Sequence, residues 1–387
     1  MSTFRLVAIG LVFAAFASRV AAQELHFVPQ ELPTIQAAVD VCLPGDTILV
    51  SAGTYAEAVV VTGASGLLIQ GKGKVVIDPP DDSDALVLVG CTDVTVKRVR
   101  AAGAVNGFTL TGCTGGALLK CHAQDLTGSG IVLDDCSGVT VDKCTIEDAA
   151  VDGIALGATE LLPSFACLVS RNRVYRTGDE GVHVSADDTV VLHNLIVEST
   201  GDGIRLETEP PSARNVVDRN KVVRSGGQGI VVQGEDHELH ENTVLESTDT
   251  GVRAREATNC ILEECRVVRC ATSGIVVTDG SSLVYVLESV VKDAGENGIE
   301  VGSNEAVVGG SRCLGAGHDG YLIAGHYGAY TANIAKGSMS NGFEILGGSN
   351  TLMLNIGKCS TDGFDLNDPS IGTNSIDASN HFGTVAP

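Results

Sequence analysis

The chain has 387 residues, of which 47 are glycine and none is tryptophan, and its formal net charge is −23. The apolar share of 44% is enough to form a core, which excludes general disorder. The acidic surplus excludes a basic nucleic-acid binder and would be repelled by an anionic membrane surface, because no positive excess is left to neutralise phosphates.

The first 22 residues have the pattern of a secretory signal. Arg5 gives a positive start, Leu6 to Ala17 is an unbroken run of apolar and small residues, and Val20 to Ala22 offers a cleavage site before Gln23. The run is too short to span a bilayer comfortably, and no later apolar stretch is long enough, so no membrane span is expected. We therefore expect an exported protein that is secreted, periplasmic or held at the cell surface. Its mature part has 23 basic and 48 acidic residues, net −25.

Residues 23–45 are predicted to form an N-terminal cap. A cap is needed because the open end of a stack of strands exposes strand edges and core. The coils are expected over residues 46–376, and a polar tail over 377–387. The elements of the cap, in chain order, are the helix N-cap Thr34, the apolar stripe Ile35, Ala38 and Val39, and the stop Pro44-Gly45-Asp46.

A four-residue motif, Gly-Ile-x-Leu with variants, recurs through the rest of the chain. Its glycines are separated by 23, 28, 22, 26, 22, 23, 24, 22, 22 and 21 residues, and a second series of Cys, Asn and Ser keeps almost the same irregular steps. A period near 22 indicates a solenoid, and the longer steps indicate insertions in single coils. The glycines are Gly130, Gly153, Gly181, Gly203, Gly229, Gly251, Gly274, Gly298, Gly320, Gly342 and Gly363; the second series is Cys121, Cys144, Asn172, Asn194, Asn220, Asn242, Cys265, Ser289, Ser311, Asn333 and Asn355.

The residue types select the kind of solenoid. The segments between glycines alternate with period two and are rich in Val, Ile and Thr, as in Val139-Thr140-Val141, so they are predicted to be strands. Three short strands and three turns fit one repeat, and about 14 such coils stack into a parallel β-helix with rungs about 4.8 Å apart. We expect the repeated Asn to hydrogen-bond along the stack, and each motif glycine to permit a tight turn of positive φ.

The mature part contains all twelve cysteines. Cys91, Cys113 and Cys136 follow the repeat spacing, as do Cys121 and Cys144, so we expect them to stack in adjacent rungs as small buried residues. Export would permit disulfides, and their connectivity stays open. No pair of C-x-x-C units is present, so a structural zinc site is not indicated.

The N-terminal segment resembles a known family, and the later Asn and Gly-Ile-x-Leu series resemble the repeats of that family. Thr34 to Val39, Pro44 to Thr47 and Gly53-Thr54-Tyr55 are similar to the cap and first coil of secreted right-handed β-helix proteins of the pectin-lyase-like superfamily. The resemblance covers nearly all of the mature chain and implies a right-handed coil. That superfamily includes polysaccharide lyases, hydrolases and epimerases, phage tailspikes and surface proteins without known catalysis, so the resemblance is specific for fold and weak for activity.

Two columns of outward positions are candidates for chemistry. The x of each motif faces outward if its apolar neighbours face inward, and the residue before each motif glycine lies in the adjoining turn. His183 and Arg205 are consecutive in the first column, which ends at Asp365, and Asp152, Glu180 and Asp202 are consecutive in the second. Acids at rung spacing repel one another, so they either attract a hard cation such as calcium or raise a pKa toward use as a general acid.

These columns predict a cleft in the middle coils that binds or cleaves an extracellular, acidic polysaccharide in a lyase-like or hydrolase-like reaction. The insertions Gly157 to Phe165 and Glu207 to Ala213 would border it. Acids would act as acid and base, and His183 or Arg205 would take a proton or bind a uronate carboxylate. The candidate catalytic residues are Asp152, Glu180, His183, Asp202 and Arg205; the substrate-binding ones are Tyr175, Glu160, Glu207 and Arg253; and the calcium ligands are Asp152, Asp179 and Asp202.

The alternative is a non-catalytic surface or matrix protein. Asp before Gly is ordinary turn chemistry, and His183 and Arg205 would then be solvated strand residues. The catalytic signatures of polygalacturonases, uronan epimerases and pectate lyases are absent, and the low aromatic content counts against tight sugar stacking. A second cluster is expected to be an exposed patch of turn residues or a sugar subsite, and the basic stretch Lys97 to Arg100 a solvated strand face. That second cluster is His318, Asp319, Tyr321, His326, Tyr327 and Tyr330.

Overall fold

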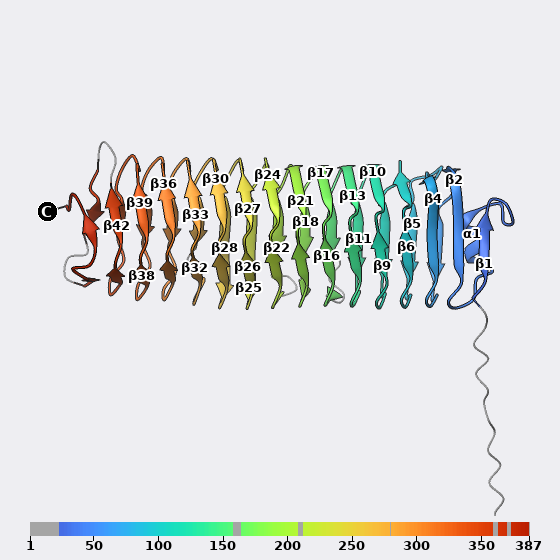
Figure 1. Cartoon of the computed structure of the whole chain (residues 1–387), viewed down its shortest axis with the longest axis horizontal. Helices are drawn as coiled ribbons and strands as arrows, with labels where there is room; N and C mark the ends of the chain where they lie inside the picture. Colours follow the sequence, from blue (N-terminus) through green and yellow to red (C-terminus); the bar gives the residue numbers. More distant parts are fainter. Residues whose placement is uncertain are drawn as a thin grey trace, which may run out of the picture.

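The computed structural model describes residues 23–157, 164–207, 212–278, 280–358, 363–369 and 373–386. Over these residues the chain is a long stack of coils with one short helix at its N-terminal end (Figure 1). Neighbouring strands of successive coils pair in parallel, as β14 (Ile154–Leu156) does with β18 (Val182–Val184). The prediction of a parallel β-helix with a capping helix is confirmed.

The stack has three faces, and each coil contributes one strand to the first of them. The strands of this first face form a sheet of 14 strands. This sheet contains the repeated motif. Its strands are β3 (Val59–Thr62), β5 (Leu86–Val89), β8 (Phe108–Thr111), β11 (Ile131–Asp134), β14, β18, β22 (Ile204–Leu206), β25 (Ile230–Glu235), β28 (Val252–Thr258), β31 (Ile275–Val277), β34 (Ile299–Val301), β37 (Tyr321–Ile323), β40 (Phe343–Ile345) and β43 (Leu366–Asn367).

A continuous sheet of 29 strands covers the second and third faces, joined at β1 (Leu25–Val28), β2 (Thr47–Tyr55) and β4 (Leu68–Ile77). The second face comprises β6 (Thr95–Lys97), β9 (Ala117–Leu119), β12 (Thr140–Asp142), β16 (Leu168–Ser170), β20 (Val190–Leu192), β23 (Val216–Asp218), β26 (Glu238–His240), β29 (Ile261–Glu263), β32 (Tyr285–Leu287), β35 (Val307–Gly309), β38 (Ala329–Thr331), β41 (Thr351–Met353) and β44 (Ser375–Ile376). The third comprises β7 (Arg100–Ala102), β10 (His122–Leu126), β13 (Thr145–Ala149), β17 (Arg173–Thr177), β21 (Leu195–Ser199), β24 (Lys221–Val223), β27 (Thr243–Leu245), β30 (Arg266–Val268), β33 (Val290–Lys292), β36 (Arg312–Leu314), β39 (Ile334–Lys336), β42 (Ile356–Lys358) and β45 (His381–Phe382); β15 (Ser164–Phe165) and β19 (Ala186–Asp187) form a separate pair.

The core runs along the axis of the stack. In each motif the second and fourth residues point inward, so Ile204 and Leu206 are fully buried while Arg205 between them is partly exposed. The register keeps like positions together, because Ile204 pairs with Val182 below and Ile230 above. The predicted orientation of the motif is therefore correct over these coils.

Glycine is required in the motif for a different reason from the one expected. Gly153, Gly181 and Gly203 do not have positive φ; a Cβ on Gly203 would instead lie 2.2 Å from the Val222 side chain and 2.5 Å from the Gly229 carbonyl oxygen. Glycine is required there because chain segments approach closely, not because the turn is left-handed. The left-handed positions fall on other residues at the coil corners, such as Arg171 with φ 55°.

The asparagine ladder is confirmed and closes one corner of each coil. Asn194 is buried, accepts hydrogen bonds from the backbone N–H and the side chain of Asn172, and donates from its amide to the Val169 carbonyl at 2.8 Å. Asn220 accepts in the same way from Asn194. These side chains satisfy buried backbone groups that the turn leaves unpaired.

The stacked cysteines are also confirmed. Eleven cysteines among the described residues carry free thiols, and all except Cys42 are buried. Cys91 and Cys113 are 2% exposed and Cys136 is fully buried, so they pack as small core residues in successive coils.

Both ends of the stack are closed by local structure. The cap helix α1 (Ile35–Val39) begins after Thr34, whose Oγ1 accepts a hydrogen bond from the Ala37 N–H at 3.0 Å, and Ile35 is fully buried. At the other end β45 pairs with β42, so strand structure continues into the segment expected to be a tail. The last coil is also shifted by two residues from the predicted register, since Glu344 pairs with Asn367 rather than with Asp365.

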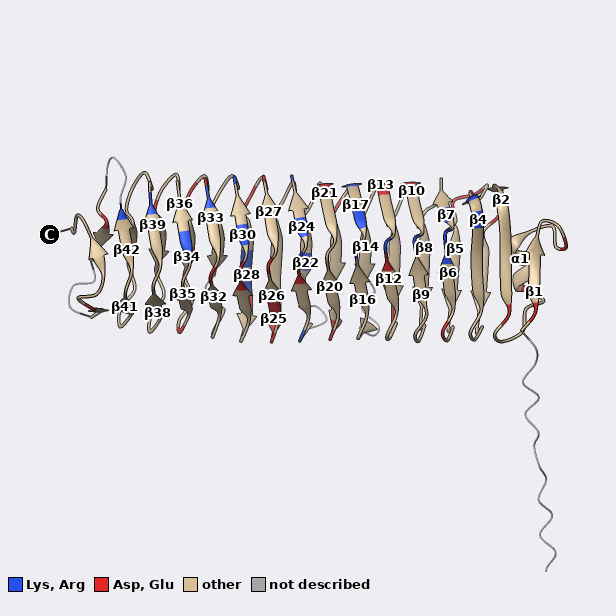
Figure 2. Ribbon diagram, viewed as in Figure 1, with Lys and Arg blue, Asp and Glu red and all other residues tan. Residues whose placement is uncertain are grey.

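Acidic and basic residues lie along the whole length of the stack (Figure 2). No helix among the described residues is both long and apolar enough to cross a membrane.

Candidate functional site

Three consecutive strands of the first face position the candidate site. Strands β14, β18 and β22 pair in register, so Ala155, His183 and Arg205 form one outward column. Ala155 is small and almost fully buried, which leaves the space beside His183 to longer side chains. The two basic side chains therefore lie on neighbouring coils, as the repeat spacing predicted.

The acids before the motif glycines form a second column next to the first. Asp152, Glu180 and Asp202 are each less than a tenth exposed. Asp152 Oδ1 accepts a hydrogen bond from the Glu180 N–H at 3.1 Å, and Asp202 Oδ1 accepts one from the Gln228 N–H at 2.7 Å. One oxygen of each Asp thus serves the turn, and the other, Oδ2, contacts the basic column.

His183 joins the first acid of this column to Glu207. Its Nε2 lies 2.8 Å from Glu207 Oε2 and 3.3 Å from Ser185 Oγ, and its Nδ1 lies 3.7 Å from Asp152 Oδ2. Burial alone would lower the pKa of His183, but the contact with Asp152 and the charges of Asp152, Glu207 and Glu180 outweigh it, so the pKa is raised. The imidazole is therefore held toward its cationic form.

Arg205 joins the remaining acids. Its Nη1 lies 3.3 Å from Asp202 Oδ2 and 3.7 Å from Glu180 Oε1, and its Nη2 lies 3.2 Å from Glu207 Oε1. Because Glu207 contacts both Arg205 and His183, the six side chains form one continuous network over three coils. We call this network the middle cluster: Asp152, Glu180, His183, Asp202, Arg205 and Glu207.

Glu180 is the most perturbed acid of the middle cluster. Burial, followed by the negative charges of Asp152 and Asp179, raises the pKa of Glu180 to about 8. Burial also raises the pKa of Asp202, although the Gln228 N–H and Arg205 oppose the shift. A carboxyl group that keeps its proton at neutral pH can donate it to a substrate, which is the task of a general acid.

Several predicted site residues lie elsewhere. Asp152 and Asp202 are two coils apart with Glu180 between them, so they do not converge directly. Tyr175 lies on β17 of the third face, paired with Glu147 and Val197, and cannot line this site. Arg253 is in the same column as Arg205 but two coils away, 3.1 Å from Thr250 Oγ1. Glu160 lies outside the described residues, as do most of the two insertions.

The arrangement of possible metal ligands also differs from the predicted set. Among the described residues, Asp152, Glu180 and His183 offer ligand atoms that all lie within 4.8 Å of one another. The predicted calcium ligands Asp179 and Asp202 are not in that group, and Asp179 is exposed. Sequence reasoning missed Ser185 and placed Glu207 only at the wall, although both are two residues beyond an x position and so lie on the same outward side of the strand.

The predicted second cluster is divided between core and surface. Tyr321 and Tyr330 are fully buried; Tyr321 stacks on Phe343 with ring centroids 4.5 Å apart and donates to the Ser311 carbonyl at 2.6 Å. They are core residues, so the expectation of an exposed patch is wrong for them. Asp319 is also fully buried and lies 3.0 Å from His318 Nδ1. Tyr327 is exposed.

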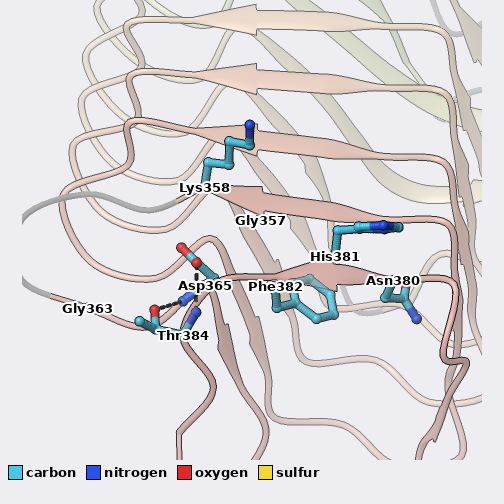
Figure 3. Close-up of a pocket in the computed structure, with 9 residues that line it drawn as sticks. Gly357, Lys358, Gly363, Asp365, Asn380, His381, Phe382 and Thr384 are labelled. Atoms are coloured by element: carbon cyan, nitrogen blue, oxygen red, sulfur yellow. Dashed lines mark hydrogen bonds between the residues drawn. The ribbon is translucent and has the colours of Figure 1, made fainter.

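A large hollow lies at the C-terminal end, away from the middle cluster. Its volume is about 730 Å³, and Lys358, His381 and Phe382 line it together with residues of the last turn (Figure 3). Asp365 accepts from the Thr384 N–H at 2.8 Å, and Thr384 Oγ1 accepts from the Asp365 N–H at 3.0 Å. These bonds hold the final turn of the stack, and none of the predicted catalytic residues lines the hollow.

The sequence matches one family model, described as a right-handed β-helix region, over residues 53–160 and 160–312. The chain belongs to the right-handed β-helix family. The match covers more than half of the chain and agrees with the predicted superfamily. No curated protein matches the sequence.

Solved structures with the same fold include enzymes and an adhesin. An alginate lyase from Paenibacillus is 14% identical, with a TM-score of 0.50 and coverage of 68% of this chain and 93% of that chain. The catalytic unit of an α-1,3-glucanase from Streptomyces thermodiastaticus is 15% identical, with a TM-score of 0.50 and coverage of 90% of this chain and 66% of that chain. PfbA, a surface adhesin of Streptococcus pneumoniae, is 10% identical, with a TM-score of 0.55 and coverage of 76% of this chain and 88% of that chain. At these identities the likeness shows the fold alone.

Proposed function

We propose that this protein is exported and cleaves an acidic polysaccharide on its first face, with Glu180 as the general acid. The observation that carries the proposal is that Glu180, with a pKa of about 8, lies next to Arg205 and on the coil between Asp152 and Asp202. A protonated carboxyl beside fixed positive charge is suited to protonate a leaving-group oxygen while cations bind the substrate.

The other members of the middle cluster have complementary roles. Arg205 has a planar, fully charged guanidinium that is partly exposed, so it can bind the carboxylate of a uronate as a fork. His183, held toward its cationic form, can assist from the neighbouring coil. Asp202, one coil beyond Glu180, is the candidate base that activates water or removes a proton from the sugar ring.

Calcium is part of the proposal only as a competitor of the Glu180 proton. Calcium prefers oxygen ligands, and Asp152 and Glu180 supply carboxylate oxygens beside the His183 nitrogen. Glu180 must lose its proton to bind a cation, so calcium should bind more tightly at pH 9 than at pH 6. Arg205 already supplies positive charge to Glu180 and Asp202, so we expect cleavage to persist in chelator.

A non-catalytic binding rod is the second candidate. It is favoured by the closure of the middle cluster, in which Glu207 and Asp202 already have partners at 3.3 Å or less. The likeness to a surface adhesin supports it at the level of fold. In that case the network would stabilise the stack and leave sugars intact.

The deciding experiment is an assay of the purified protein on pectic, alginate and neutral polysaccharides, each with calcium or with chelator. Ultraviolet absorbance of unsaturated uronates would identify a lyase, and new reducing ends without absorbance a hydrolase. A folded protein that releases neither product but retains a polysaccharide would contradict the catalytic proposal and favour the rod.

A further inference from the structure

A second hollow lies near the N-terminal end, at the corner between the second and third faces. Its volume is about 310 Å³, and its side-chain lining is basic, with no acid among the lining residues. Two arginines, two lysines and one imidazole contribute to it. The lining residues are Gly73, Arg98, Arg100, Lys120, Cys121, His122, Lys143 and Thr145.

The basic residues are arranged by the coil itself. Arg98, Lys120 and Lys143 occupy the same corner of three successive coils, at φ 56°, 55° and 56°. Arg100 and His122 pair in register on the adjoining strands β7 and β10. Rungs about 4.8 Å apart therefore present a straight row of positive charge. The stretch Lys97 to Arg100, which has no role in the middle cluster, belongs to this corner.

This row of charge is poorly compensated. Within the part of the chain that the structure describes, Arg98, Arg100 and Lys120 have no ion-pair partner within 4.0 Å. Lys143 lies 3.8 Å from Asp142, but that carboxylate is bound more closely by Arg171, at 2.7 Å. Like charges at rung spacing repel one another, and an anion between them relieves the repulsion.

The corner column gains partners farther along the stack. Arg171 is held by Asp142, and Arg219 by Glu241 at 2.6 Å. Beyond Arg219 the same corner position becomes acidic, with Glu241, Glu264 and Glu288 on successive coils. The uncompensated positive charge is thus confined to the first three coils of the column.

His122 adds a polar group inside the hollow. Its Nε2 is buried without a hydrogen-bond partner, and the nearest carboxylate oxygen, from Glu147, is 3.9 Å away. Burial, together with the charge of Arg100, lowers the pKa of His122, so the ring is neutral at neutral pH. A neutral ring adds no charge of its own, so the attraction for an anion comes from the arginines and lysines of the lining.

We propose that Arg98, Arg100, Lys120, His122 and Lys143 form a binding site for the carboxylate or sulfate groups of an anionic polysaccharide lying along the stack. The anionic character follows from the lining, and a polymer fits because the charges repeat on consecutive coils. A polysaccharide is favoured over single-stranded nucleic acid because no Phe, Tyr or Trp side chain lines the hollow to stack on bases. This choice of carrier rests on the proposed function, whereas the anion site does not.

The test compares two triple variants that each remove three positive charges. The first is Arg98→Asn with Lys120→Asn and Lys143→Asn, because asparagine tolerates positive φ. The control is Arg312→Asn with Lys336→Asn and Lys358→Asn, three exposed cations on the third face at the far end. Calorimetric titration with polygalacturonate should show at least tenfold weaker binding for the first variant and less than twofold change for the control.

Three outcomes would overturn the proposal. Equal losses in both variants would mean that only net charge matters, and no binding of polygalacturonate or heparin by the native protein would remove the site. Equal or tighter binding of an oligothymidylate would assign the corner to nucleic acid. If the triple variant fails to melt cooperatively, the single Lys120→Asn variant, expected to lose about threefold, replaces it. Binding that persists in a protein without cleavage activity would sink the proposed function and leave this inference standing.

Discussion

Two regions of the first face carry acids at the same positions of the coil and differ in what faces them. In the middle coils Glu180 precedes a motif glycine and has Arg205 on the next coil, 3.7 Å away. Near the C-terminus Asp319 holds the position of Glu180, and Glu344 holds that of Arg205. In the first region an acid therefore faces a cation on the next coil, whereas in the second region an acid faces another acid.

The protonation of the two glutamates follows burial and neighbouring acids rather than the facing cation, which would lower a carboxyl pKa. Burial and nearby acids raise the pKa of Glu180 to about 8, whereas burial and Asp319 raise the pKa of Glu344 only to about 6. Asp319 is fully buried but is held by the Asn341 N–H at 2.7 Å and by His318. Pairs of neighbouring acids occur both in the middle coils and near the C-terminus. What distinguishes the middle cluster as a candidate site is therefore the cations in the neighbouring column.

The largest expected effect comes from Glu180→Gln. The change removes the proton donor while keeping the shape of a side chain that is neutral at pH 7, so the fold should persist. Cleavage should fall about 100- to 10,000-fold, the usual contribution of a general acid. The matched control is Glu344→Gln in the other region, which should leave the rate unchanged in the same reducing-end or absorbance assay. The reverse pattern would move the active site to the C-terminal coils.

Removing the cation should be the next largest effect. Arg205→Ala leaves Glu180, Asp202 and Glu207 without their shared partner, and we expect a loss of about 2–4 kcal/mol in the free energy of unfolding. The control is Arg176→Ala, because Arg176 pairs with Asp148 in the open, where both side chains are about half exposed. Urea unfolding followed by circular dichroism should show little change for the control. Comparable losses would mean that the middle cluster is no more coupled than a surface ion pair.

The pH dependence separates the two glutamates directly. Because the folded pKa of Glu180 is raised, its contribution to stability is fully present below its unfolded value and is lost as pH rises through about 8. The native protein should therefore lose stability relative to the Glu180→Gln variant between about pH 4.5 and pH 8, with no further loss above, and its cleavage rate should fall above pH 8. Glu344→Gln should give the same comparison at lower pH, near 6. Coincident titrations in the two variants would remove the distinction between the regions.

Much of this comparison could be predicted from the sequence, because the fold repeats. A period near 22 places residues such as Asp152, Glu180 and Asp202 in one column without any knowledge of side-chain positions. Alternation within a short strand then assigns Arg205 to the outside. Both inferences depend only on backbone geometry, and both are correct.

What the sequence could not show depends on side chains and close packing. Tyr175 follows the Asn172 corner and so belongs to the third face, although it was predicted to line the wall of the cleft. Gly203 is needed for a contact with Val222 on the following coil, which no local turn pattern reveals. The proton on Glu180 depends on burial and on three neighbours, none of which has a signature in the repeat.

The smallest effect is expected from a substitution that gives the C-terminal region the acid–cation arrangement of the middle coils. Glu344→Arg places a guanidinium one coil beyond Asp319, as Arg205 is placed beyond Glu180, and it removes the acid that faces Asp319. Since the position is partly exposed, the new pair should add only about 0.5 kcal/mol to the free energy of unfolding. The gain should shrink in 1 M salt, where charges are screened over about 3 Å. The control Glu344→Gln removes the repulsion without supplying a cation, so the difference between the two variants measures the pair itself. If Glu344→Arg is no more stable than Glu344→Gln, the coil position does not bring a cation to the acid before glycine, and the contact of Arg205 with Glu180 must depend on Asp202 and Glu207 around it.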